Sequence, residues 1–156
     1  MIPVREETDR RIDALLTRFP HRGSALLPAL YLIQGEHGYV PPASMEYVAN
    51  KIGVSPAFVA GVVSFYTLFH REPVGRHHIQ VCRTLSCALR GCREVLRHLR
   101  DRLGIREGET TPDGRFSLEA VECLGACDIA PMLQINGEEH GRLDPKKVDA
   151  ILDRLK

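Results

Sequence analysis

The sequence of 156 residues has no tryptophan, few aromatic residues (6%) and almost no net charge. Its 21 Lys and Arg nearly balance its 20 Asp and Glu, so charge gives no reason to expect a nucleic-acid partner. No stretch approaches the roughly 18 to 20 apolar residues of a membrane span, and the N-terminal residues lack the apolar core of a signal peptide. We therefore expect a soluble, cytoplasmic protein with no nucleic-acid partner and no direct membrane insertion.

The motifs of several enzyme classes are also missing. Gly35, Gly38 and Gly61 are too far apart for a dinucleotide-binding fingerprint, and no glycine-rich phosphate loop is present. None of the seven histidines stands at a recognisable spacing from a nucleophile and a carboxylate. The sequence therefore predicts no catalytic residues and no nicotinamide or flavin site in the chain itself.

The first part of the chain, residues 1–72, has the apolar periodicity of helices. Ser24 and Ser55 stand where helix N-caps are expected, and Pro56 suits a first helical position. Glycines at the far ends, among them Gly53, are typical helix stops. Four helices are predicted, over residues 7–19, 24–38, 42–52 and from 56 through the apolar run 57–69. We expect these helices to form a bundle that docks on a partner.

The second part, residues 73–156, changes to a mixture of strands and helices. Residues 70–75, which span the boundary between the two parts, are predicted to form a linker. Strands are predicted over residues 76–82, within 111–123 and within 131–137, and helices over about 89–103 and 144–155. This order indicates a small sheet with helices packed on it, so the predicted fold class of the whole chain is α+β.

Four of the five cysteines form two pairs, and each pair follows a strand-like run. Cys82 and Cys87 are separated by four residues, and Cys123 and Cys127 by three. Two loops at one end of a sheet could bring these thiols together, and four thiolates are the ligand set of iron–sulfur clusters. A [2Fe–2S] cluster has two irons that each take two thiolates, which suits two separated pairs. We predict that these four cysteines bind such a cofactor as metal ligands.

The fifth cysteine, Cys92, differs from the other four. It lies with Leu96, Leu99 and Leu103 on the apolar stripe of the predicted helix, so we expect a small buried side chain rather than a fifth ligand. Gly125 and Ala126 lie between the second pair, where small residues let backbone N–H groups approach sulfur.

Three other interpretations fit parts of the sequence. A four-cysteine zinc site would make the chain a zinc-stabilised interaction module, although zinc pairs are often separated by only two residues. Two disulfides would suit an oxidising compartment better than the cytosol. Residues 43–66 have the outline of a helix-turn-helix, but their second helix has no Arg, Lys, Asn or Gln to contact bases.

With these residues assembled, the chain resembles the thioredoxin-like [2Fe–2S] subunit of NADH:quinone oxidoreductase (complex I). Related subunits occur in NAD-dependent formate dehydrogenases and hydrogenases. The matching stretches run in order along nearly the whole chain: HGYVP at 37–41, GVVSFYTLF at 61–69, PVGRHHIQVC at 73–82, CALRG at 87–91, TPDGRFSLEAVECLGACDIAP at 111–131 and MLQIN at 132–136.

The resemblance implies an N-terminal helical bundle, residues 1–72, and a thioredoxin-like domain with a small mixed sheet, residues 73–156. It implies one [2Fe–2S] cluster on Cys82, Cys87, Cys123 and Cys127, with no ligand role for Cys92. It also implies an oxidoreductase complex with other peripheral-arm subunits at the cytoplasmic face of the inner membrane. There the cluster would exchange single electrons with the FMN of a flavoprotein subunit that binds NADH and carries a [4Fe–4S] cluster.

Overall fold

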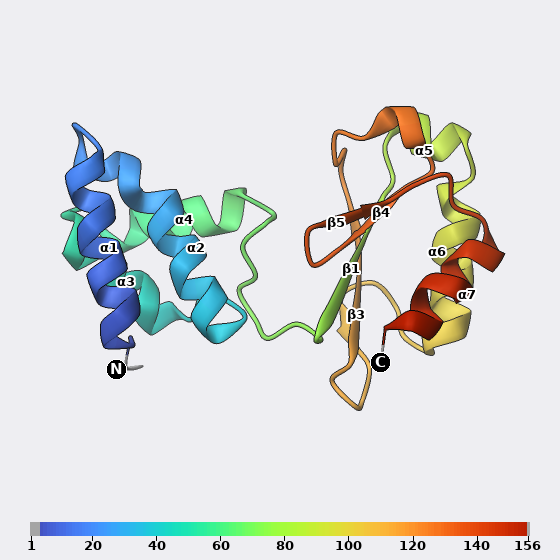
Figure 1. Cartoon of the computed structure of the whole chain (residues 1–156), viewed down its shortest axis with the longest axis horizontal. Helices are drawn as coiled ribbons and strands as arrows, with labels where there is room; N and C mark the ends of the chain where they lie inside the picture. The colour runs from blue at the N-terminus through green and yellow to red at the C-terminus, as the bar shows by residue number, and fades with distance from the viewer. Residues whose placement is uncertain (1–3, 156) are drawn as a thin grey trace. The chain divides into compact units, whose positions relative to one another are not determined.

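The computed structural model describes residues 4–155, and the chain divides into two compact units between Pro73 and Val74. Among the described residues, the first unit contains only helices, whereas the second contains a five-stranded sheet with helices (Figure 1). The predicted fold class, α+β, is therefore confirmed.

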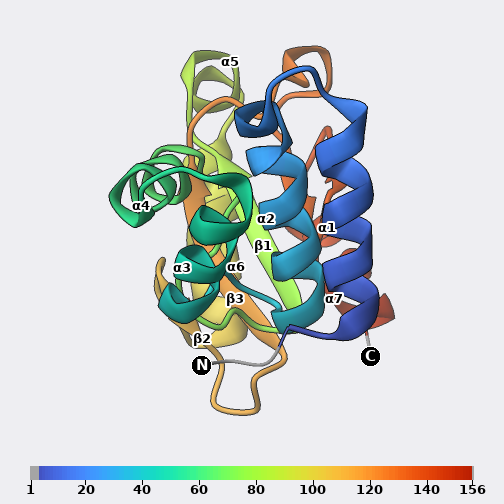
Figure 2. The same cartoon turned by 90° about the vertical axis from the view of Figure 1, so that its left-hand side faces the viewer.

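The N-terminal unit is a bundle held by one apolar core. Its elements are α1 (Glu6–Arg18), η1 (Arg22–Ala25), α2 (Leu26–His37), α3 (Pro42–Ile52) and α4 (Pro56–Phe65). Helices α1 and α2 lie side by side (Figure 2). The core takes fully buried side chains from each helix, including Ile12, Leu30, Val48 and Val59. Removal of these side chains from water is the main force that stabilises the bundle.

Three helix ends lie where the sequence predicts them. Gly38 and Gly53 follow α2 and α3 with φ values of 78° and 85°, which only glycine adopts without strain. The Ser55 side chain accepts a hydrogen bond from the N–H of Phe58 at 3.2 Å and so caps α4.

The predicted N-cap at Ser24 is wrong. Ser24 lies inside the 3₁₀ turn η1, and α2 starts two residues later, at Leu26. Proline explains the shift. If Ser24 were the N-cap, Pro28 would be the fifth residue counted from the cap. The backbone N–H of that residue makes the first hydrogen bond within the helix, and proline has no N–H to donate. Starting at Leu26 keeps Pro28 among the first residues, whose N–H groups have no partner within the helix.

Helix α4 ends at Phe65, before the end of the predicted apolar run. The segment that follows is held by Gln34, whose side chain donates to the carbonyl of Leu68 at 2.8 Å and accepts from the N–H of His70 at 2.7 Å. Phe69 is 5% exposed and packs its ring against Tyr31, with the ring centroids 4.9 Å apart. These contacts satisfy backbone groups that a longer helix would have paired internally.

The C-terminal unit is built on a small mixed sheet, as predicted. Its strands stand in the order β2-β3-β1-β4-β5, with β1 parallel to β3 and the other neighbours antiparallel. The elements are β1 (His77–Cys82), α5 (Leu85–Leu89), α6 (Cys92–Leu103), β2 (Glu109–Thr110), β3 (Phe116–Val121), η2 (Cys127–Ile129), β4 (Leu133–Ile135), β5 (Glu138–His140) and α7 (Pro145–Arg154).

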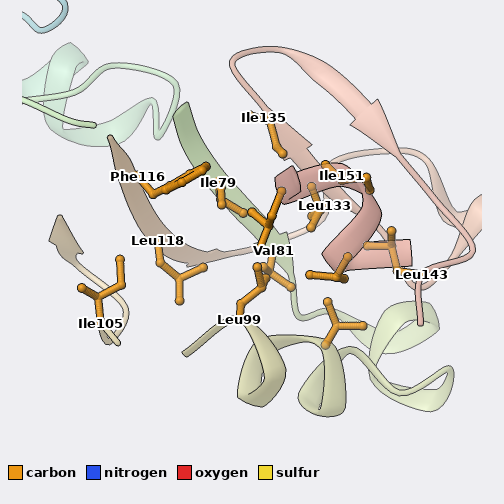
Figure 3. Close-up of a cluster of buried hydrophobic side chains, with 13 residues drawn as sticks. Ile79, Val81, Leu99, Ile105, Phe116, Leu118, Leu133, Ile135, Leu143 and Ile151 are labelled. Atoms are coloured by element: carbon orange, nitrogen blue, oxygen red, sulfur yellow. The ribbon is translucent and has the colours of Figure 1, made fainter. Parts of the chain in front are cut away.

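Helices α6 and α7 cover one face of this sheet (Figure 1). The core between them takes alternate residues of the strands, such as Ile79 and Val81 of β1, together with Leu99 of α6 and Ile151 of α7 (Figure 3). This alternation is what a strand with one buried face requires. The two ends of β1 and β3 are thereby fixed, which determines where the cysteine loops begin.

The helix predicted over about residues 89–103 is found as α6, which begins three residues later, at Cys92, and a separate short helix, α5, which was not predicted, precedes it. Helix α5 ends at Leu89, and α6 begins at Cys92 after Gly91, whose φ of 94° lies in the left-handed region. The chain changes direction there because glycine alone takes this conformation at little cost. Strands β2 and β5 were not predicted either, since each has only two or three mostly polar residues.

No single helix among residues 4–155 is long and apolar enough to cross a membrane. Helices α3 and α4 taken together reach that length and composition, but they are bent by 119° relative to each other.

Candidate metal centre

The strand pairing puts both cysteine loops at one end of the sheet. Cys82 is the last residue of β1 and pairs with Val121, the last residue of the parallel strand β3. Cys87 follows in α5, whereas Cys123 lies just beyond β3 and Cys127 starts η2. Figure 1 shows α5 and the η2 turn at the same end of the sheet. The structure therefore places the two cysteine-containing loops at one end of the sheet, as the sequence analysis expects.

Cys123 and Cys127 already stand at the spacing of two ligands on one metal ion. Their sulfur atoms are 3.6 Å apart. Two thiolates on a tetrahedral ion, with bonds of about 2.3 Å, have their sulfurs about 3.8 Å apart. The N–H of Gly125 donates to the Cys123 sulfur at 3.4 Å, from a residue with φ of 89°. Both cysteines are exposed, so ions can reach them.

Cys82 and Cys87 lie deeper than the second pair. They are 2% and 1% exposed, and they pack with Cys92, Ala130 and Met132 in a small cluster beneath the loops. The Cys82 sulfur is 3.3 Å from the hydroxyl oxygen of Thr84. The first pair thus has one side against the protein interior, where solvent does not compete for the sulfurs.

Hydroxyl and backbone groups connect the two pairs. Besides its contact with Cys82, the Thr84 hydroxyl acts to lower the pKa of Cys123, and the Ser86 hydroxyl acts to lower the pKa of Cys127, so both hydroxyls lie near the second pair. The backbone N–H of Leu124, in the second loop, donates to the sulfur of Cys82. Sequence analysis missed Thr84 and Ser86, although both lie in the gap between the first two cysteines. The only feature of the sequence that pointed to them was a hydroxyl-bearing residue within two positions of a cysteine.

The four thiols differ in how easily they lose a proton. Burial acts to raise the pKa of Cys82, but hydrogen bonds from Thr84 and Leu124 outweigh it, so the pKa is below the usual value. Burial is the main cause that raises the pKa of Cys87 to about 11. The Gly125 N–H lowers the pKa of Cys123, whereas the bond to Cys123 raises that of Cys127. Each pair therefore has one more acidic thiol.

Cys92 is buried, as predicted from its place on the apolar stripe. It is 3% exposed and begins α6, and burial raises the pKa of its thiol. It packs beside Cys82 and Cys87 in the same small cluster. Cys92 therefore forms part of the apolar support under the first pair.

Charges of both signs surround the loops. The guanidinium of Arg83, next to Cys82, contacts the carboxylate of Glu122, next to Cys123, at 2.7 Å and 3.1 Å. This ion pair joins the first residues of the two loops across the end of the sheet. Because both side chains are more than 60% exposed, it contributes little to stability.

The donor set fits an iron–sulfur cluster by its chemistry. Four thiols converge on one end of the sheet, and backbone N–H groups are directed at three of their sulfurs. Within the described part of the chain, no three His, Cys, Asp or Glu side chains are arranged so that they could hold a metal ion as they stand. The assignment of the four cysteines as ligands therefore stays a prediction.

Comparison with known families decides what kind of protein has this arrangement. The family model described as "Thioredoxin-like [2Fe-2S] ferredoxin" matches residues 12–156. The chain belongs to this family. The resemblance predicted from the sequence is thereby confirmed, and the matched residues contain the whole sheet and both cysteine pairs.

The relatives of the chain within this family are subunits of larger complexes. The chain is 48% identical to an NADH-quinone oxidoreductase subunit of Rhizobium meliloti, over 98% of this chain and 89% of that protein. It is 42% identical to NADH-quinone oxidoreductase subunit 2 of Thermus thermophilus, over 83% and 72%. Among solved structures, it resembles an NAD+-reducing [NiFe]-hydrogenase in the H2-reduced state, with a TM-score of 0.71 and 26% identity, over 83% of this chain and 22% of that one.

Proposed function

We propose that this chain is the electron-transfer subunit of an NADH-quinone oxidoreductase, in which it carries one [2Fe–2S] cluster. The observation that supports this most directly is the convergence of two cysteine pairs, one with its sulfurs 3.6 Å apart, in a chain 48% identical to a subunit of such an oxidoreductase. Cys82, Cys87, Cys123 and Cys127 would hold the cluster. When bound, the cluster supplies a one-electron carrier.

The residues around the loops would position and tune that carrier. The N–H groups of Gly125 and Leu124 direct positive dipoles at sulfur, which favours the more negative, reduced state. The Thr84 and Ser86 hydroxyls would stabilise the thiolates of the second pair, because they act to lower the pKa of Cys123 and Cys127. Cys92 and Met132 exclude water beneath the first pair. The chain itself provides no hydride-accepting residue, so the NADH chemistry belongs to a partner subunit.

We propose that this partner is a flavoprotein subunit with FMN, an NADH site and a [4Fe–4S] cluster, beside other subunits of a peripheral arm. Single-electron exchange requires the two redox groups to be close, so the partner must cover the cysteine end of the sheet. Leu85 and Leu89 of α5 support this, because they are 74% and 79% exposed beside Cys87. Exposed apolar side chains of this size mark protein interfaces.

We propose that the N-terminal unit, residues 1–72, also docks on the complex. Helix α4 contains no charged residue, and two of its aromatic side chains, Phe58 and Phe65, are 55% and 78% exposed. Aromatic residues of this kind dominate the energetics of many interfaces. The location follows from this assembly: the chain would work in the cytoplasm, at the face of the inner membrane, without entering the lipid.

A second candidate is the equivalent subunit of an NAD-reducing hydrogenase or formate dehydrogenase. The resemblance to the hydrogenase chain, at a TM-score of 0.71, supports it. The higher identity to NADH-quinone oxidoreductase subunits favours the first candidate. Isolating the native complex through a tagged chain and assaying it for quinone reduction by NADH, and for NAD+ reduction by hydrogen or formate, distinguishes the two.

The experiment that tests the cofactor is a visible spectrum of the anaerobically purified chain with iron and sulfide analysis. We expect a red-brown protein with about two irons and two sulfides per chain. Changing Cys123→Ser or Cys127→Ser should remove the colour, whereas Cys92→Ser should keep it. A colourless chain that holds one zinc ion would instead support a zinc-stabilised interaction module.

A further inference from the structure

We propose that a groove between α1 and α2 binds an amphipathic helix of a partner protein, with carboxylates about seven residues apart beside its apolar face. The groove lies entirely in the N-terminal unit, has a volume of about 740 Å³, and is lined by Leu15, Phe19, Leu27 and Tyr31 among others. The proposal does not depend on the cysteines or on the cofactor.

The floor of this groove is apolar, although it is open to solvent. Leu15 and Phe19 of the α1 segment and Leu27 of α2 are only partly buried, and Tyr31 is 47% exposed. The fully buried core of the bundle uses other residues of the same helices, such as Ile12 and Leu30. The two helices therefore present a second apolar surface that the bundle does not cover.

The rim of the groove has charge of one sign. Its only charged lining residues are Arg11 and Arg18, both exposed and both on α1. They are seven residues apart, which is about 10 Å along the helix axis. A partner helix that runs along α1 would meet both guanidinium groups if its carboxylates had the same spacing of about two turns.

The groove continues toward the start of α1. A second hollow of about 310 Å³ shares Arg11, Tyr31 and Leu32 with the first and is also lined by Glu36. In that stretch the Arg5 guanidinium lies 4.0 Å from the Glu36 carboxylate, and Glu7 also lines the hollow, so the charges there balance. The 13 residues of α1 span about 20 Å, which suits a partner helix of three to four turns.

A helix fits this surface better than an extended segment or a second copy of the chain. A helix satisfies its own backbone hydrogen bonds, whereas a strand on an apolar floor would leave them unpaired. Symmetric pairing of two copies through this groove would bring Arg11 and Arg18 against the same arginines, which is unfavourable. The apolar floor would supply most of the affinity, and the arginines would select the partner.

The test uses the full chain with its cofactor and two synthetic helical peptides that differ only in charge. Both have leucines at helical spacing, flanked by two glutamates or by two lysines seven residues apart. Fluorescence anisotropy should give saturable binding of the glutamate peptide and about tenfold weaker binding of the lysine peptide, as expected for two exposed ion pairs. The double variant Arg11→Glu, Arg18→Glu should reverse this preference.

Two further variants separate the groove from the general surface. Ala14→Gln, at an exposed position in the groove, should weaken both peptides, whereas Arg10→Glu on the same helix should change neither. Equal binding of both peptides, or no saturable binding, overturns the proposal. A dimer detected by sedimentation and abolished by Ala14→Gln would assign the groove to a second copy, which also overturns it. Unchanged visible absorbance in every variant keeps this result separate from the proposed redox function.

Discussion

The cysteine thiols within each pair are not equivalent, because each sulfur has a different neighbour. Cys82 and Cys123 accept hydrogen bonds from backbone N–H groups, which stabilise the thiolate. Cys87 is buried, and the hydrogen bond with Cys123 raises the pKa of Cys127. Binding of metal ions needs all four as thiolates, so it must displace protons from Cys87 and Cys127.

This difference predicts how the stability of the cofactor-free protein depends on pH. The pKa of Cys87 is raised to about 11 in the folded chain, so its neutral thiol stabilises the fold. That contribution is complete below the ordinary thiol pKa of about 8.5 and is lost as pH rises to about 11. Denaturant unfolding should show a loss of up to about 3 kcal/mol across this range.

The control for this prediction is Cys87→Ala, which has no proton to lose. Its free energy of unfolding should vary less over the same pH range than that of the original chain. If the two proteins show the same dependence, the effect comes from other groups and the prediction is wrong.

Arg83 should affect the reduction potential of the proposed cluster. A positive charge beside the first ligand favours the reduced, more negative state, and Glu122 at 2.7 Å offsets part of this effect. We expect Arg83→Glu to lower the midpoint potential by roughly tens of millivolts, and Glu122→Gln to raise it. A spectroscopic redox titration measures both, and an unchanged or raised midpoint in Arg83→Glu contradicts the argument.

Among the helices, α1 is connected to α3 through polar contacts of Lys51 and Tyr47. The Lys51 ammonium contacts the carboxylates of Asp9 and Asp13, the latter at 3.0 Å, and Asp9 also accepts from the Tyr47 hydroxyl. The hydrogen bonds from Lys51 and Tyr47 lower the pKa of Asp9. Polar contacts at this position fix how the two helices pack at the edge of the apolar core.

Removing the Asp9 charge should destabilise the N-terminal unit. We expect Asp9→Asn to cost about 1 kcal/mol of the free energy of unfolding near neutral pH. Because the folded pKa is lowered, the contribution exists above the ordinary pKa of about 3.9 and is lost as pH falls through the folded pKa. Urea unfolding at several pH values should therefore show the variant and the original converging in acid.

A matched control is Glu6→Gln, which removes an exposed pair with Arg10 on the same helix. That change should alter stability by less than about 0.5 kcal/mol. Equal effects of the two substitutions would mean that Asp9 acts only as surface charge.

At the scale of the whole molecule, the exposed apolar side chains predict where the partner docks. Leu85 and Leu89 stand beside Cys87 and bury little of their surface in this chain. We expect Leu85→Glu and Leu89→Glu together to reduce electron transfer from NADH in the reconstituted complex by tenfold or more, as loss of about 1.4 kcal/mol or more at an interface would. Stopped-flow reduction of the cluster chromophore measures this.

The matched control for docking is a leucine far from the cysteines in sequence, the partly buried Leu155 at the end of the chain, changed to Glu. The visible spectrum of the isolated chain should be the same in all these variants. If the α5 variant transfers electrons at the original rate, the partner approaches the cluster from another side.

Much of the local structure could be predicted from short-range rules. Gly38, Gly53 and Ser55 determine helix ends through their own backbone and side-chain chemistry, so their neighbours in sequence are sufficient. Where a rule depended on more than one residue, prediction was less reliable. Pro28 moved the start of α2 away from Ser24, and Gly91 moved the start of α6 from the predicted Leu89 to Cys92.

The sequence by itself determined the fold class, the family and the four candidate ligands, because cysteine spacing and apolar periodicity depend only on residues close together in the sequence. Only the tertiary structure decided that both loops leave one end of the sheet, since that depends on the parallel pairing of β1 with β3. It also brought Thr84 and Ser86 to the second pair and opened the groove between α1 and α2. Such contacts join residues distant in sequence, and which distant residues meet is decided by packing rather than by any local pattern.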